Sequence, residues 1–268
     1  MTTPTPEHLA YVLRLADTAL ILAQRNTEWC GHGPVLEEDI ALANMSLDLI
    51  GQARLLYTHA ATLEKARGGP ERTEDDYAYF RNEREFRNYT LAELPHFGPL
   101  AGTVHAPNDY AVTIVRNFLY ATLMAHLWHA LLQSADAQLA AIAERSLKET
   151  RYHVHHARDW LVRLGDGTDE SHRRTQAALD WLMPYTREFF STDAVETGVA
   201  EAGIAPLTAQ LEAAWRADVE AAIDEATLAL PAPVAHVTTG KLGEHSEHMG
   251  YVLAEMQSLA RQHPGARW

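Results

Sequence analysis

The stretch that decides the fold runs from residue 36 to residue 66 and reads LEEDIALANMSLDLIGQARLLYTHAATLEKA. Two apolar stripes follow it at helical spacing. The first repeats at strict sevens and consists of Leu42, Leu49, Leu56 and Leu63. The second consists of Ile40, Ala43, Leu47 and Ile50. A helix that is apolar on more than one face is usually central and buried. We therefore expect a long buried helix here, which stops at the Gly-Gly-Pro run of residues 68–70.

Helical spacing of apolar residues also dominates the rest of the chain. Long helices are expected at residues 8–28, 110–133 and 137–164 beside the one at 36–66. Further helices are expected at residues 76–93, 171–190 (with a kink at Pro184), 207–226 and 244–262. Loops fit residues 95–107 and 231–243, and no stretch shows a convincing period of two. The sequence predicts an all-α antiparallel helical bundle, with additional C-terminal helices, as one domain over residues 1–268.

The charge balance and cysteine content exclude several function classes. Of 268 residues, 22 are basic and 36 acidic, which gives a net charge of −14. A field of this sign repels phosphate backbones and anionic lipid, so we expect no nucleic-acid partner and no membrane partner. Cys30 is the one cysteine, which excludes an intramolecular disulfide. The start lacks the pattern of a signal peptide, and no apolar run is long enough for a membrane span. We expect a cytoplasmic protein.

Helical bundles bind metals through inward-facing acids and Glu-x-x-His pairs, because residues three apart share a helix face. A di-iron carboxylate site takes an acid from each of two helices and a Glu-x-x-His pair from each of the other two. The first long helix offers Asp17 midway and Glu28 at its end. Ala19 and Leu20 occupy the neighbouring inward stripe.

The other three long helices do not supply this pattern. The second contains Asp48, but no histidine follows it three residues later. The third has no Asp or Glu between residues 109 and 136. On the fourth, Glu149 and His153 are four apart rather than three. Because one helix supplies no carboxylate at all, we expect no complete di-iron site, and we assign no catalytic, cofactor-binding or metal-binding residue to this chain.

The remaining histidines and the cysteine have simpler interpretations. On the long helices they are His126, His129, His153, His155 and His156. We interpret these as core or surface residues, and the sequence shows no acid near the pair at 126 and 129. The best residual metal candidate is His245 with His248, which can share a helix face. We favour helix capping and interface packing for residues 245–248 instead. We expect Cys30 to be a small buried residue.

Three segments resemble a known protein family. They are residues 26–34 (NTEWCGHGP), residues 43–54 (ANMSLDLIGQAR), and the C-terminal run of residues 243–250 (GEHSEHMG) with 253–257 (LAEMQ). All three resemble the C subunit of the bacterial phenylacetyl-CoA epoxidase (ring 1,2-phenylacetyl-CoA monooxygenase), which is ferritin-like. The resemblance runs along nearly the whole chain. It implies a homologous catalytic A subunit that holds a di-iron centre and epoxidises the aromatic ring with O₂ and electrons from a separate reductase.

The resemblance also indicates where the iron ligands of the catalytic relative fall in this chain. Four of the ligands fall on Leu49, Gln52, Thr150 and His153, and the remaining two fall near Ala19 and Ala121. Only His153 matches a ligand type, and one position in six does not hold iron. The resemblance therefore implies no cofactor in this chain and a di-iron centre in its partner.

We interpret the chain as a non-catalytic structural subunit that pairs with, and stabilises, the di-iron catalytic subunit in aerobic phenylacetate degradation. It would then belong to an oxidoreductase complex, with the reductase as an indirect partner. One alternative is an active di-iron carboxylate oxygenase, which Leu49, Gln52 and the acid-free third helix disfavour. Another is a free-standing helical scaffold protein. An iron assay and co-purification with a catalytic subunit separate the three.

Overall fold

Helices account for the regular structure of the computed structural model, which describes residues 3–98 and 108–266. Within these ranges the only β pairing is an isolated bridge between Thr239 and Glu244. The helical content confirms the all-α, ferritin-like class. None of the helices in the described ranges combines the length and apolarity needed to cross a bilayer. Most of the loop expected at residues 95–107, and the first two residues, lie outside what the structure describes.

Contacts divide the chain into two compact units. The first comprises residues 1–94, 194–202 and 239–268, and the second comprises residues 95–193 and 203–238. The expectation of a single domain over residues 1–268 stays a prediction. Each unit contains one pair of long helices.

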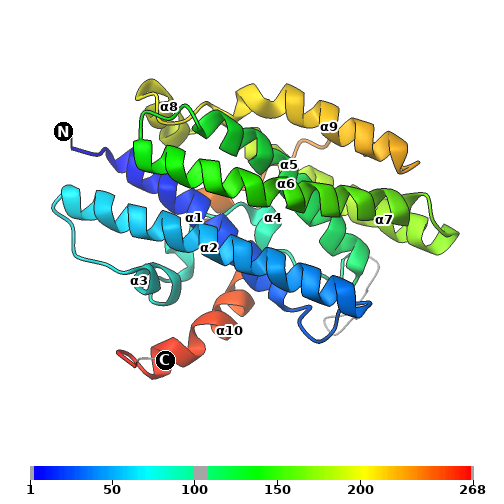
Figure 1. Ribbon diagram of the computed structural model, residues 1–268, viewed down its shortest axis with the longest axis horizontal. Coiled ribbons are helices and arrows are strands. Elements are labelled where there is room, and N and C mark those ends of the chain that lie inside the picture. Colours follow the sequence, from blue (N-terminus) through cyan, green and yellow to red (C-terminus); the bar gives the residue numbers. More distant parts are fainter. Residues whose placement is uncertain (1–2, 99–107, 267–268) are drawn as a thin grey trace. The chain divides into compact units, whose positions relative to one another are not determined.

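In the first unit, α1 (Pro6–Thr27) and α2 (Leu36–Ala66) form an antiparallel hairpin (Figure 1). Thr5 caps α1, because its side chain accepts a hydrogen bond from the backbone N–H of His8. The connecting loop buries Trp29 and ends at the start of α2. Both helices lie within a few residues of their expected bounds, since local periodicity and the turn residues at each end specify them.

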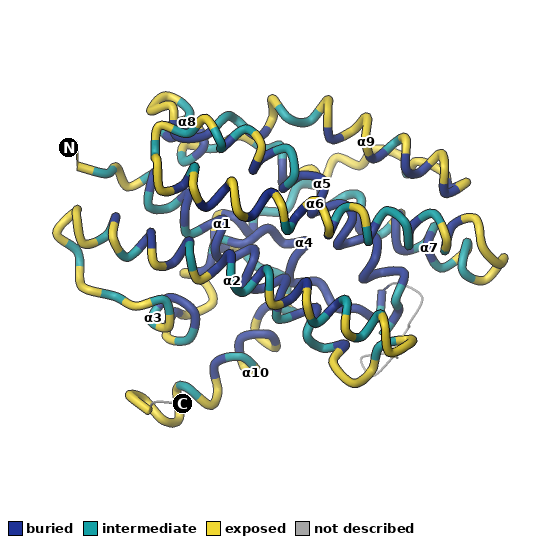
Figure 2. Tube along the Cα trace, in the orientation of Figure 1, coloured by how far each residue is buried: buried dark blue, intermediate teal, exposed yellow. Residues whose placement is uncertain are grey.

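One of the two apolar stripes of α2 is buried, and the other is not. Leu42, Leu49 and Leu56 are at most 3% exposed, as predicted. Ile40 and Leu47 are instead 52% and 64% exposed. The expectation that both faces of this helix are buried was therefore wrong. In Figure 2 the tube of α2 changes repeatedly between buried and exposed residues along its length.

The expectation of a single helix at residues 76–93 was also wrong. The chain forms three short elements there, α3 (Glu74–Tyr79), η1 (Glu83–Glu85) and α4 (Thr90–Glu93). Capping boxes at Thr73 and at Asn82 start the first two. The backbone N–H of Arg87 donates to the carboxylate of Asp17 at 2.8 Å instead of to a helical carbonyl. A buried contact with α1 therefore replaces the helix that local propensity favours.

Two later stretches of sequence return to complete the first unit. They are α8 (Ala194–Glu201) and, after η4 (Gly240–Leu242), α10 (His248–Gln262). One Glu196 oxygen accepts from Arg14 of α1 at 3.3 Å and from Lys241 of η4 at 2.8 Å. All three side chains are at most 2% exposed. Because all three charges are buried, removing one would leave another without its counterion. The cluster therefore stabilises the packing of α1, α8 and η4, which are far apart in the sequence.

The second unit is built on the hairpin of α5 (Tyr110–Leu131) and α6 (Ala137–Gly165). Figure 2 shows α5 buried along most of its length. Asp136 caps α6 by accepting hydrogen bonds from the backbone N–H groups of Gln138 and Leu139. The remaining elements are α7 (Asp169–Leu182), η2 (Met183–Phe190), η3 (Thr208–Leu211) and α9 (Glu212–Glu225). The helix expected at residues 171–190 is α-helical only to Leu182, and a 3₁₀ helix that contains Pro184 follows it.

Candidate functional site

The first hairpin buries the three positions that the resemblance equates with iron ligands. Ala19 lies on α1, and Leu49 and Gln52 lie on α2. All three are at most 3% exposed. Alanine and leucine offer no donor atom to a metal, and a carboxamide is a much weaker ligand for iron than a carboxylate or an imidazole. These three positions therefore offer no acid to a di-iron centre.

The second hairpin is similar. Ala121 lies on α5, while Thr150 and His153 lie on α6, and all three are buried. No residue of α5 between Tyr110 and Leu131 is an Asp or a Glu. His153 is the one imidazole in the set, without the Glu three residues before it that the di-iron motif uses. Judged by their donor atoms, the residues present do not fit a di-iron centre.

The acid midway along the first helix has a structural partner. Asp17 is fully buried. Its carboxylate accepts hydrogen bonds from the Tyr57 hydroxyl at 2.6 Å, from two Arg81 nitrogens, and from the Arg87 backbone N–H. Burial alone would lower the pKa of Arg81, but the adjacent Asp17 outweighs it and raises that pKa. Burial and the charge of Asp17 likewise raise the pKa of Tyr57. Asp17 is thus committed to an ion pair with Arg81 and is not an open metal ligand.

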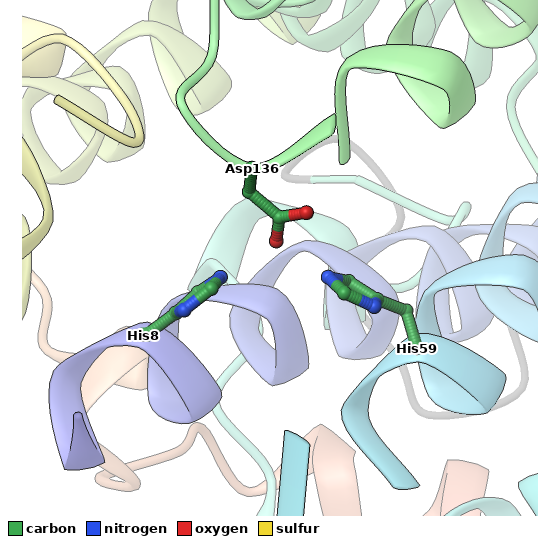
Figure 3. Close-up of side chains that lie close together, drawn as sticks. All are labelled: His8, His59 and Asp136. Atoms are coloured by element: carbon green, nitrogen blue, oxygen red, sulfur yellow. The ribbon is translucent and has the colours of Figure 1, made fainter. Parts of the chain in front are cut away.

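Two histidines that are far apart in the sequence lie side by side in the first unit. His8 of α1 and His59 of α2 are both buried, and their ring centroids are 6.1 Å apart in an edge-to-face arrangement (Figure 3). They are 51 positions apart, so only the register of the hairpin places them side by side. Two imidazoles supply half of the four donors that a structural zinc site takes.

His245 and His248 do not share a helix face, contrary to the expectation from the sequence. Only His248 is in α10, and His245 precedes the helix. The imidazole Nδ1 of His245 lies 2.8 Å from a Glu93 oxygen, and its Nε2 lies 3.1 Å from the Phe86 carbonyl. The other Glu93 oxygen accepts from the Ser246 backbone N–H at 2.5 Å. Glu93 thus bonds to both His245 and Ser246, in the segment just before α10. The helix begins at His248, so the expectation of a helix from residue 244 was wrong by four residues.

The two histidines of this cluster have opposite pKa shifts. Burial opposes the charge on His245, but the hydrogen bond and negative charge of Glu93 outweigh it and raise the pKa of His245. Burial, together with the positive charge of Arg25, lowers the pKa of His248. Glu93 therefore favours the charged form of His245, whereas a histidine that binds a metal must be neutral.

His126 has an acidic neighbour in space, although none is near it in the sequence. Asp218 of α9 places a carboxylate oxygen 2.7 Å from His126 Nε2. The pair lies on the wall of a cleft of about 470 Å³ between α5, α6 and α9, with Arg151 and Arg158 nearby. A carboxylate beside an imidazole fixes its tautomer, but none of the described residues that line this cleft is a Ser or Cys that could act as a nucleophile.

The last two candidates are on the surface. His155 pairs with Asp159 one turn further along α6, at 3.4 Å, and its side chain is 76% exposed. Cys30 is exposed in the loop between α1 and α2, so the expectation of a buried cysteine was wrong. The neighbouring Trp29 takes the buried place in that loop.

These observations define a ferritin-like helical protein, in which the positions that the resemblance equates with iron ligands carry side chains that do not fit a di-iron centre. The chain belongs to a family described as phenylacetic acid catabolic protein, whose model matches residues 1–268. It is 45% identical over 259 residues to the C subunit of the 1,2-phenylacetyl-CoA epoxidase of Escherichia coli, covering 97% of this chain and 98% of that protein. A subunit of an epoxidase in phenylacetate catabolism is therefore what this chain resembles along nearly its whole length.

Proposed function

We propose that this chain is the non-catalytic structural subunit of a cytoplasmic phenylacetyl-CoA epoxidase complex, in which it pairs with a homologous di-iron catalytic subunit. One observation carries the proposal. Of the six ligand-equivalent positions, five hold side chains that are neither carboxylate nor imidazole, and all six are buried. A bundle with this interior is stable through packing and can hold a partner without holding iron.

The physical reason lies in the cost of burying charge. In a di-iron protein the metal compensates the inward carboxylates. Without metal, each buried carboxylate would cost several kcal/mol or be driven to protonate. Ala19, Leu49 and Ala121 avoid that cost. A subunit of this kind contributes a rigid helical surface that positions the helices of the catalytic subunit, while the separate reductase supplies the electrons.

The two alternatives differ in what they require of this chain. An active di-iron oxygenase needs acids on all four long helices, and α5 carries none. A free-standing scaffold needs no partner, but the similar E. coli protein is named as a subunit. We therefore place the paired, iron-free subunit first.

Co-expression with the catalytic subunit, followed by metal analysis of the complex and of each chain, tests the proposal. We expect this chain alone to hold less than about 0.1 iron per chain and to show no epoxidase activity with the reductase. We expect the complex to retain the iron of the catalytic subunit. About two tightly bound irons in this chain alone would contradict the proposal, as would separate elution of the two chains at micromolar concentration.

A further inference from the structure

The face of α2 opposite its buried stripe carries a second apolar stripe that reaches the surface. We name it the α2 seam, and it consists of Leu36, Ile40, Ala43, Leu47 and Ile50. Leu36 is 72% exposed, and Ile40 and Leu47 are each more than half exposed. Ala43 and Ile50 are partly exposed. An apolar stripe of this extent on a protein surface marks an interaction site more often than a random scatter of leucines does.

The spacing of the seam indicates the shape of its occupant. Successive members are 4, 3, 4 and 3 residues apart, which is the spacing of a coiled-coil seam. With a rise of 1.5 Å per residue, the seam is about 21 Å long. It ends where Arg54 and Thr58 continue the same face with polar side chains. A partner α-helix, packed at a shallow angle with its side chains in the gaps of the seam, fits this pattern.

The charge beside the seam argues against a second copy of this chain. One edge of the seam carries Glu37 and Asp48, at about 100° and 120° around the helix from Leu36. If two copies paired as antiparallel helices about a two-fold axis, this acidic edge would face itself. Each copy also brings a net charge of −14. A different chain, with basic residues along the facing edge, has no such repulsion.

We propose that the α2 seam binds an α-helix of the catalytic epoxidase subunit. That helix carries apolar residues at the same 4-3 spacing, and Lys or Arg residues opposite Glu37 and Asp48. This inference rests on the proposed function and deepens it by naming the surface that does the pairing. The buried stripe of α2, with Leu49, keeps the helix in its own hairpin, while the seam remains available to the partner.

The test compares two identical substitutions on two exposed leucines in the full chain. Leu47→Glu places a charge in the middle of the seam, and Leu259→Glu places one on α10, where the leucine is 55% exposed. Each variant is mixed with the purified catalytic subunit, and its Kd is measured by titration and by co-elution. We expect Leu47→Glu to weaken binding by about 100-fold or more, as for a charge in the centre of an interface. We expect Leu259→Glu to stay within about threefold of the parent.

A second arm tests the acidic edge with the double variant Glu37→Lys, Asp48→Lys. We expect its association rate constant to fall about tenfold at low salt and to approach that of the parent at high salt, because steering between opposite charges is screened by ions. An unchanged or faster rate would contradict the proposed basic partner edge. Thermal unfolding of every variant, run in parallel, checks that the fold is intact.

The outcomes separate the two levels of the proposal. If the parent chain does not bind the catalytic subunit, the proposed function fails. If the parent binds and Leu47→Glu binds equally well, only the seam is wrong. Equal loss of binding in Leu47→Glu and Leu259→Glu also overturns the seam, since the effect is then not specific to it. The seam assignment is also overturned if the parent alone is a dimer and the Leu47→Glu variant is a monomer.

Discussion

The imidazole of His245 lies between two hydrogen-bond acceptors, the carboxylate of Glu93 and the carbonyl of Phe86. A neutral imidazole has one N–H and can donate to only one of them. Both contacts are satisfied together when His245 carries two protons. The side chains of His245 and Glu93 are fully shielded from solvent. This ion pair joins the approach to α10 with α4, although the two residues are 152 positions apart.

This arrangement predicts a stability that depends on the proton of His245. The pKa of His245 is raised in the folded chain above its ordinary value of about 6.5. A raised pKa means that the contribution to stability is fully present below about pH 6.5 and is lost as pH rises through the folded pKa. We expect the difference in unfolding free energy between the parent and His245→Gln to be largest near pH 6 and smaller at higher pH. Urea denaturation across this range measures it.

His155→Gln is the matched control, because this histidine is exposed on α6 and its contact with Asp159 is at the surface. Its effect on stability should stay below about 0.5 kcal/mol at every pH. A difference between the parent and His245→Gln that is constant from pH 6 to pH 9 would show that His245 does not carry the second proton.

The two leucines at positions 47 and 49 lie on opposite faces of α2 and make a matched pair. Leu49 is 3% exposed and Leu47 is 64% exposed. We expect Leu49→Glu to lower the unfolding free energy by about 3 kcal/mol or more, from lost apolar burial and charge desolvation together. We expect Leu47→Glu to change it by less than about 1 kcal/mol. Urea denaturation of both variants at neutral pH measures the difference.

Restoring part of the ligand set should not restore iron. We expect the double variant Leu49→Glu, Gln52→His to bind no stoichiometric iron, since Ala19 and Ala121 still provide no carboxylate. Metal analysis after anaerobic incubation with ferrous iron checks this. A Leu49→Glu variant as stable as the parent would show that position 49 does not pack in the interior of the hairpin. It would also contradict the assignment of position 49 to a former ligand site.

The ion pair of Asp17 with Arg81 predicts strong coupling between the two side chains. Removing one partner leaves the other charge buried without its counterion, which costs about 3–5 kcal/mol. We expect Asp17→Asn and Arg81→Met each to destabilise by this order, and the double variant to destabilise by clearly less than the sum. Denaturation of the four proteins of the cycle gives the coupling energy.

The pair of Arg54 and Glu74 serves as the control cycle. Its side chains are 69% and 35% exposed, at 3.3 Å. Exposed pairs are typically worth less than about 1 kcal/mol, so the coupling should be correspondingly small. Additive effects at Asp17 and Arg81 would mean that the two charges do not depend on each other.

Local sequence signals were sufficient for the long helices. The bounds of α2 follow from its apolar periodicity, its acidic first turn and the Gly-Gly-Pro stop, and the structure places it at Leu36–Ala66. The same signals failed at residues 76–93. The expected helix is interrupted where the Arg87 backbone N–H donates to Asp17, 70 positions away. A periodicity window cannot register a hydrogen bond over that distance.

Contacts between distant positions also account for the errors at single residues. Asp218, which pairs with His126, is 92 positions further along the chain. Glu93 decides where α10 begins, although the residues around His245 suggest an earlier start. The side-by-side placement of His8 and His59 depends on the hairpin register of α1 and α2. Each of these pairs depends on how helices pack, and the residues next to them in the sequence carry no sign of it.

The sequence by itself determined the helical class, the long helices and the absence of an acid on α5, because residue type and spacing along one segment specify all three. The tertiary structure decided which face of α2 is covered. The stripe of Leu42, Leu49 and Leu56 and the stripe of Ile40 and Leu47 are both apolar at helical spacing. Only the packing of α2 in its hairpin buries the first and leaves the second exposed, since burial is a property of neighbours in space.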